Sequence, residues 1–130
     1  MGSSMNKLAN CHNQYQGEEK RVLCVCSAGL LRSPTMAQVL YEEYEYNTRA
    51  VGITEEYALM DVTDVLIEWA DEIVVAEKWM GEEIMKRFPG VTGFTSLDLP
   101  DRFGRMDTDL VELIKERYKE ADEDLPGLAA

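Results

Sequence analysis

Residues 21–34 read Arg21-Val-Leu-Cys-Val-Cys-Ser-Ala-Gly-Leu-Leu-Arg-Ser-Pro34, and this stretch decides the fold. After the arginine comes a continuous apolar run, which is typical of a strand buried on both faces of a parallel sheet. The run ends in Ser-Ala-Gly, and the Ser33-Pro34 pair then favours the start of a helix with Ser33 as its cap. A strand that turns through a short loop into a helix is the first unit of an α/β fold.

The rest of the chain alternates between strand and helix patterns in the same way. We predict further strands at residues 48–53, 71–76 and 93–97, and helices after Pro34 and at residues 62–70, 78–88 and 107–121. The alternation predicts an α/β three-layer sandwich, in which a small, doubly wound, four-stranded parallel sheet has helices on both faces. Ligands bind such sheets beyond the carboxyl ends of the strands, where the loop after residue 26 lies.

The length of 130 residues suits one domain. Residues 1–20 are polar and without a repeating pattern, so we expect a flexible N-terminal tail followed by one domain over residues 21–125. A net charge of −12 disfavours nucleic acid and anionic membranes as partners. An odd number of cysteines, three, argues against a disulfide scaffold and for the reducing cytoplasm. We expect a monomer.

Cys26 and Arg32 are separated by five residues at the end of the first predicted strand. Backbone N–H groups of this loop and of the helix start can converge on one anion, and Gly29 permits a tight wrap. Arg32 offers a planar fork to two phosphate oxygens, and Ser33 can donate a hydrogen bond to the sulfur. A thiolate here is placed for in-line attack on phosphorus, which gives a phosphocysteine without metal or other cofactor. The predicted phosphate-binding residues are Ser27, Ala28, Gly29, Leu30, Leu31 and Arg32.

Phosphoryl transfer also requires a group that protonates the leaving oxygen and later activates water. The single histidine, His12, lies in the predicted tail, so a carboxylic acid on a loop is the natural source. Asp98 and Asp101 flank a Leu-Pro pair after the fourth predicted strand, at the same end of the sheet as Cys26. We predict Asp101 as the general acid and base, with Asp98 as the second candidate.

These residues resemble the low-molecular-weight protein tyrosine phosphatases, and in particular a shortened branch of predicted phosphatases. The resemblance covers roughly residues 21–119. Val25-Cys26 to Ser33-Pro34 is similar to the phosphate loop of that family, and Asp101-Arg-Phe103 stands where the family has Asp-Pro-Tyr. The resemblance implies that Cys26 is the nucleophile, Arg32 the phosphate clamp, Ser33 the thiolate stabiliser and Asp101 the general acid and base.

The chain departs from the family pattern at several positions. Leu31 replaces a cysteine that commonly stands beside the loop arginine, and Gly29 replaces an asparagine. The segment between residues 53 and 70, where the family has its aromatic specificity wall, is short, and Tyr57 is a candidate substitute for that wall. Arg102 and Phe103 replace the Pro and Tyr of the family's Asp-Pro-Tyr sequence.

The sequence therefore predicts a metal-independent, cysteine-dependent protein tyrosine phosphatase that acts on a phosphorylated protein or a small aryl phosphate. The alternative is a catalytically weak or inactive phosphate- or phosphoprotein-binding module that uses the same loop. Arsenate reduction normally needs resolving cysteines downstream of the loop, and none follows Cys26. A sugar-transport phosphocarrier normally lacks an arginine in this loop, so Arg32 argues against that class.

Overall fold

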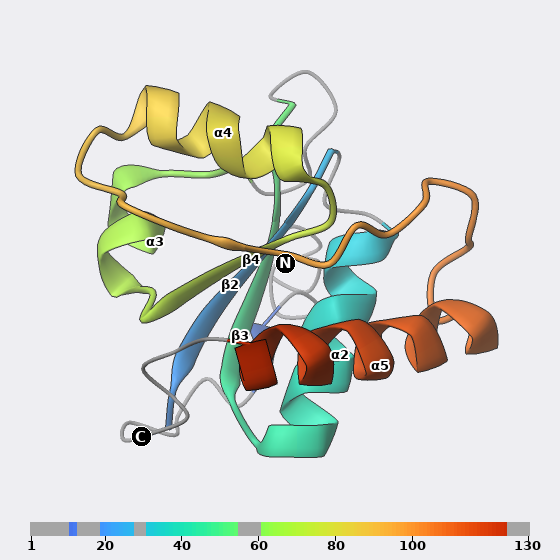
Figure 1. Ribbon diagram of the computed structural model, residues 1–130. Helices are drawn as coiled ribbons and strands as arrows, with labels where there is room; N and C mark the ends of the chain where they lie inside the picture. The colour runs from blue at the N-terminus through green and yellow to red at the C-terminus, as the bar shows by residue number, and fades with distance from the viewer. Residues whose placement is uncertain (1–10, 13–18, 28–30, 55–60, 125–130) are drawn as a thin grey trace, which may run out of the picture.

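The computed structural model describes residues 11–12, 19–27, 31–54 and 61–124 (Figure 1). In chain order the elements are β1 (Cys11–His12), β2 (Arg21–Cys26), α2 (Arg32–Tyr44), β3 (Asn47–Gly52), α3 (Asp64–Trp69), β4 (Glu72–Val75), α4 (Lys78–Arg87), β5 (Thr95–Ser96) and α5 (Thr108–Asp124). Each predicted strand and helix of residues 21–125 is present, with ends that differ from the prediction by a few residues.

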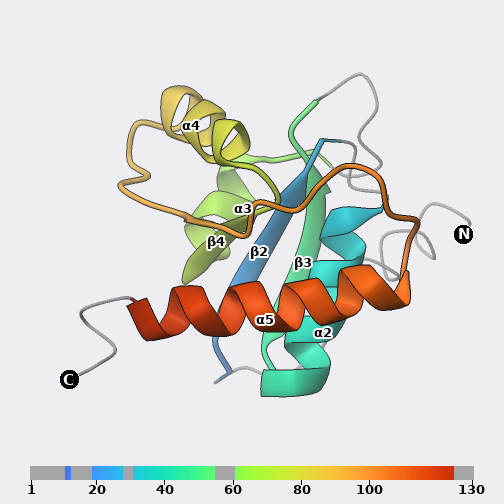
Figure 2. The same ribbon diagram turned by 45° about the vertical axis from the view of Figure 1, so that its right-hand side comes forward.

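The sheet has the strand order β1-β3-β2-β4-β5, in which β3, β2, β4 and β5 are parallel. Helices α2 and α5 cover one face and α3 and α4 cover the other, as the two views show (Figures 1 and 2). The predicted doubly wound, four-stranded parallel sheet is therefore confirmed. Strand β1 adds an antiparallel edge, in which residues 11 and 12 pair with Arg49 and Thr48. No pattern in residues 1–20 predicts this two-residue strand.

The crossovers that follow the neighbouring strands β2 and β4 run in opposite directions along the sheet. The chain moves from β2 to β3 on one side and later from β4 to β5 on the other, so the loops after β2 and β4 separate at the carboxyl edge of the sheet. Such a topological switch point is where doubly wound sheets bind their ligands. Cys26 ends β2 and Glu77 follows β4 closely, so these two residues flank the switch point.

The core explains why these segments form these elements. Val22 to Val25 of β2 are fully buried between the helix layers, as the apolar run predicts. On α5 the buried residues Leu110, Ile114 and Tyr118 are four positions apart, which is the spacing of one helix face. The short helix α3 lies nearer the surface, because Val65 is 74% exposed and no residue of that helix is buried.

A buried polar contact fastens α5 to the sheet. The Tyr118 hydroxyl donates a hydrogen bond of 2.7 Å to Glu72 of β4, and Thr95 of β5 donates to the same carboxylate. Lys20 forms an ion pair with it at 2.7 Å. Burial raises the pKa of the Tyr118 phenol above its usual range, so this group remains a donor at physiological pH. Helix α5 therefore has a fixed position relative to β4 and β5.

Gly81 in α4 tests how tightly the layer of α3 and α4 packs. A Cβ atom at this position would lie 2.3 Å from a ring carbon of Phe94. Alanine usually favours a helix over glycine by about 1 kcal/mol, but overpacking costs about 1–3 kcal/mol. The two effects together leave a net loss, and we expect Gly81→Ala to lower the free energy of unfolding in urea by up to about 2 kcal/mol. The control, Glu82→Ala, changes an exposed position of the same helix and should be nearly neutral; a stabilising Gly81→Ala would contradict the packing described.

Candidate active site

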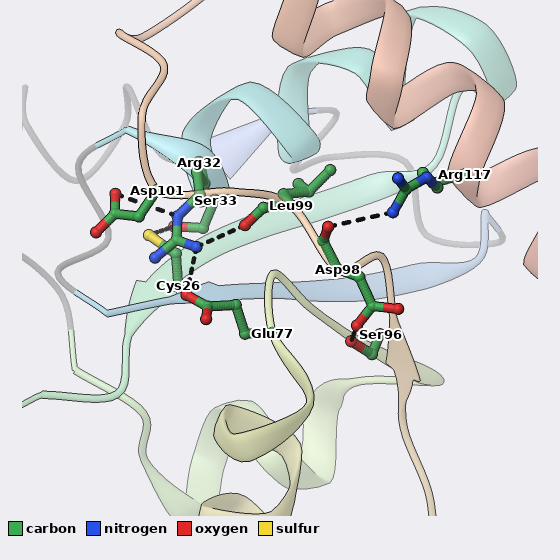
Figure 3. A network of polar contacts seen from close by, with 9 residues as sticks. All are labelled: Cys26, Arg32, Ser33, Glu77, Ser96, Asp98, Leu99, Asp101 and Arg117. Carbon is green, nitrogen blue, oxygen red and sulfur yellow. Dashed lines mark hydrogen bonds and ion pairs between the residues drawn. The ribbon is translucent and has the colours of Figure 1, made fainter.

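The sulfur of Cys26 lies at the carboxyl end of β2 and is almost buried, with 3% of the residue exposed. The Cys26 thiol donates a hydrogen bond of 3.2 Å to Ser33 Oγ. The Ser33 hydroxyl in turn donates to the carbonyl of Val51 at 3.2 Å. Ser33 is completely buried, so these two contacts fix its side chain against the sulfur. Figure 3 shows Ser33 beside Cys26. The structure thus brings the predicted nucleophile and its predicted hydroxyl partner together.

The start of α2 differs from the prediction that Ser33 caps the helix. The helix begins at Arg32, and its N-cap is Leu31, whose side chain makes no capping hydrogen bond. Ser33 lies inside the first turn because its hydroxyl is used by Cys26 and Val51 instead. The first turn of α2 carries no acidic residue, which suits a helix end that faces an anion.

Arg32 is buried, with only 2% of its surface exposed, although it carries a charge. Its Nη1 donates a hydrogen bond of 2.6 Å to Glu77 Oε2 and another of 2.9 Å to the carbonyl of Leu99. Its Nε lies 3.6 Å from Asp101 Oδ1. Figure 3 shows the guanidinium group near Cys26, with Glu77 and Asp101 on different sides of it. A buried cation needs such partners, because an uncompensated buried charge is costly.

The two aspartates that the sequence offered as general acid lie differently. Asp101 is 62% exposed and in an ion pair with Arg32. Asp98 has a carboxylate that accepts a hydrogen bond of 2.8 Å from Ser96, and it points away from Cys26 (Figure 3). We call residues 97–101 the acid loop. Of its two carboxylates, the one of Asp101 faces the site.

Of the predicted phosphate-binding residues, the structure also describes Ser27 and Leu31. The carbonyl of Ser27 accepts a hydrogen bond from the Thr54 N–H, which continues the pairing of β2 and β3. Leu31 is 42% exposed at the start of α2. The predicted residues Ala28, Gly29 and Leu30 of the phosphate loop, and Tyr57, lie outside the described residues.

Sequence reasoning gave no role to Glu77 and Thr35. Glu77 follows β4, the strand beside β2, so its place at the same sheet edge as Cys26 was available from the topology rule. The Thr35 hydroxyl donates to the carbonyl of Leu31 at 2.7 Å and accepts from the Met106 N–H at 3.0 Å. No motif in the sequence indicates this contact, because it joins α2 to a loop 71 residues away.

Among the described residues, no cluster of histidine, cysteine and carboxylate side chains has the composition of a metal site. Within the same part of the chain, no helix has the length and hydropathy needed to cross a membrane. In the part of the site that the structure describes, the charged side chains are those of Arg32, Glu77 and Asp101.

Comparison with solved structures identifies the fold. *Vibrio vulnificus* Wzb in complex with benzylphosphonate aligns with 82% of this chain and 99% of its own, at 21% identity and a TM-score of 0.61. The *Erwinia amylovora* tyrosine phosphatase amsI aligns with 83% and 94%, at 16% identity and a TM-score of 0.64. The chain has the fold of the low-molecular-weight tyrosine phosphatases. The YwlE arginine phosphatase from *Geobacillus stearothermophilus* shares this low-molecular-weight phosphatase fold, with 80% and 92% covered, 18% identity and a TM-score of 0.56. No family model and no curated protein sequence matches the chain.

The ion pair between Glu77 and Arg32 should stabilise the fold, and this can be tested without an activity assay. Its carboxylate compensates the buried charge of Arg32, but the effect is reduced because Glu77 is 38% exposed. We expect Glu77→Gln to lower the free energy of unfolding by about 1–2 kcal/mol in urea titrations.

The matched control is Glu83→Gln. Glu83 forms an ion pair of 2.8 Å with Arg87, and both side chains are about one third exposed. This substitution should change the free energy of unfolding by less than about 0.5 kcal/mol. Equal effects of the two substitutions would show that Glu77 has no special part in holding Arg32.

Proposed function

We propose that this protein is a metal-independent phosphatase that hydrolyses phosphomonoesters, with phosphotyrosine as the substrate, through a phosphocysteine at Cys26. The observation that carries the proposal is the grouping of Cys26, Ser33, Arg32 and Asp101 at the switch point of this fold. Each of the four groups has a separate task in covalent phosphoryl transfer.

In the first step the Cys26 thiolate attacks phosphorus as the bond between phosphorus and the leaving oxygen breaks. Arg32 stabilises the charge on the phosphoryl oxygens, together with backbone N–H groups at the start of α2. Protonated Asp101 gives its proton to the leaving phenoxide, which departs as a neutral phenol. The exposed position of Asp101 beside Arg32 supports this role, because the leaving group must reach it from solvent.

In the second step the Asp101 carboxylate takes a proton from water. The water oxygen attacks phosphorus, the bond between sulfur and phosphorus breaks, and inorganic phosphate leaves. Cys26 departs as a thiolate, and Ser33 can stabilise it because its single hydroxyl proton can turn from the Val51 carbonyl to the sulfur. The cycle ends with Asp101 protonated and Cys26 ionised, as it began.

Two observations support an aryl phosphate as the substrate class. The similar structure of Wzb holds benzylphosphonate, which carries its phosphonate on a benzyl group, and the similar amsI is a tyrosine phosphatase. In this chain Leu31 has an exposed apolar side chain at the N-terminus of α2, and an aromatic ring of the substrate could pack against it. The odd number of cysteines in the chain, three, favours a reducing compartment, and we propose the cytoplasm.

Replacing the nucleophile gives the first activity prediction. Wild type should hydrolyse *p*-nitrophenyl phosphate in the presence of a chelator, and Cys26→Ser should lose this activity, because an alcohol at this position is not ionised near neutral pH. The fully buried Cys24 provides the control, since Cys24→Ser should keep the activity if the variant folds. A wild type that binds vanadate without turnover would overturn the enzyme proposal and identify a phosphate-binding module.

The second activity prediction separates the two aspartates. Asp101→Asn should lower kcat/KM for phenyl phosphate by about 100-fold or more, because a phenoxide leaves poorly without a proton. Asp98→Asn should have a much smaller effect, since its carboxylate contacts Ser96 instead of Arg32. The reverse order of the two effects, measured by phosphate release across pH, would assign the acid to Asp98.

A further inference from the structure

We propose that Arg117 of α5 is a positioning residue for the reaction: it holds the acid loop in the conformation that presents Asp101 to the site. The inference rests on the proposed function, because it concerns delivery of a proton by Asp101. Arg117 lies on the far side of the acid loop from Cys26 (Figure 3).

The acid loop contains an irregularity at Asp98. The Leu97 N–H donates to the carbonyl of Val75 and the Leu99 N–H donates to that of Ala76, so two residues of the loop advance while β4 advances by one. Asp98 is the extra residue, as in a β-bulge, and its φ of 52° lies in the left-handed region. Bulges of this kind redirect the chain and are common next to active sites.

Arg117 binds the carbonyls exposed at this irregularity. Its Nη1 donates hydrogen bonds of 3.0 Å to Leu97 and 3.2 Å to Asp98. A left-handed conformation costs free energy for a residue with a Cβ atom, although less for aspartate than for most, and the contact from Arg117 to the carbonyl of Asp98 helps to hold it. The guanidinium is a rigid donor, and its neighbour Tyr118 fixes α5 to β4, so Arg117 holds the loop from a fixed point.

The acid loop is thus held between two arginines. On one side Arg117 binds the carbonyls of Leu97 and Asp98. On the other side Arg32 binds the carbonyl of Leu99 and pairs with Asp101. The side chains of Leu97 and Leu99 are each 1% exposed, so the loop can move little without uncovering them. Loss of Arg117 releases only the side of the loop that does not touch the substrate, and its effect should appear in proton delivery.

The experiment compares two substrates that differ in their need for a proton. Phenyl phosphate needs the general acid, whereas 2,4-dinitrophenyl phosphate has a leaving group acidic enough to depart without it. We expect Arg117→Met to lower kcat/KM about 10- to 100-fold for phenyl phosphate and less than about threefold for the dinitrophenyl ester. Lys119→Met on the same helix removes the same charge from an exposed position and is the matched control, which should leave both values unchanged.

Asp101→Asn is the reference variant that distinguishes failure of the positioning role of Arg117 from failure of the proposed function. A change in the substrate ratio for Arg117→Met, in the same direction as for Asp101→Asn, supports the positioning role. If Asp101→Asn changes the ratio and Arg117→Met does not, or lowers both substrates equally, the inference is wrong and the proposed function stands. If wild type hydrolyses neither ester, the proposed function fails and this inference with it. Should Arg117→Met not fold, Arg117→Gln decides by the same ratio.

Discussion

The burial of one positive charge organises the carboxyl edge of this sheet. Arg32 is 2% exposed, and a guanidinium in that position must be surrounded by oxygen atoms. It obtains them from the loop after β4, through Glu77, and from the loop after β5, through Leu99 and Asp101. Because Arg32 itself begins α2, one side chain joins the three loops that follow the parallel strands β2, β4 and β5. The positions of the groups around Cys26 depend on these contacts of Arg32.

The same charge bears on the proposed function, because an acidic protein would need a local attraction to accept a phosphate ester. The chain carries a net charge of −12, so its overall field repels an anion. Attraction must therefore be local, and the buried guanidinium and the start of α2 supply it where water is largely excluded. Glu77 and Asp101 partly neutralise Arg32 and fix its orientation. These two carboxylates weaken the attraction of Arg32 for an anion, but they hold its guanidinium group in one position.

The sequence was informative where one segment determines its own structure. The apolar run of residues 22–26 predicts the buried strand β2 that the structure has, because this pattern is local. The predicted phosphate loop stays a prediction, because its residues 28–30 lie outside the described part of the chain. Contacts between distant segments were not predictable in this way. Glu77 contacts Arg32, which is 45 positions away, and Thr35 contacts Met106, which is 71 positions away. Arg117 contacts Leu97 at a separation of 20 positions. None of these contacts lies within a local motif. Ser33 was misassigned as a cap because its demand for a hydrogen-bond partner is met by Cys26 and Val51.

The central claim is that Cys26 carries the phosphoryl group during turnover. The most direct test mixes the protein with 2,4-dinitrophenyl phosphate, stops the reaction by rapid denaturation within one turnover, and locates phosphorus by mass spectrometry of the peptides. We expect a transient phosphoryl group on the peptide that contains Cys26, which appears with the dinitrophenol and decays as phosphate is released. Release of phosphate with no phosphorylated peptide at any time, or with the group on another residue, would contradict it.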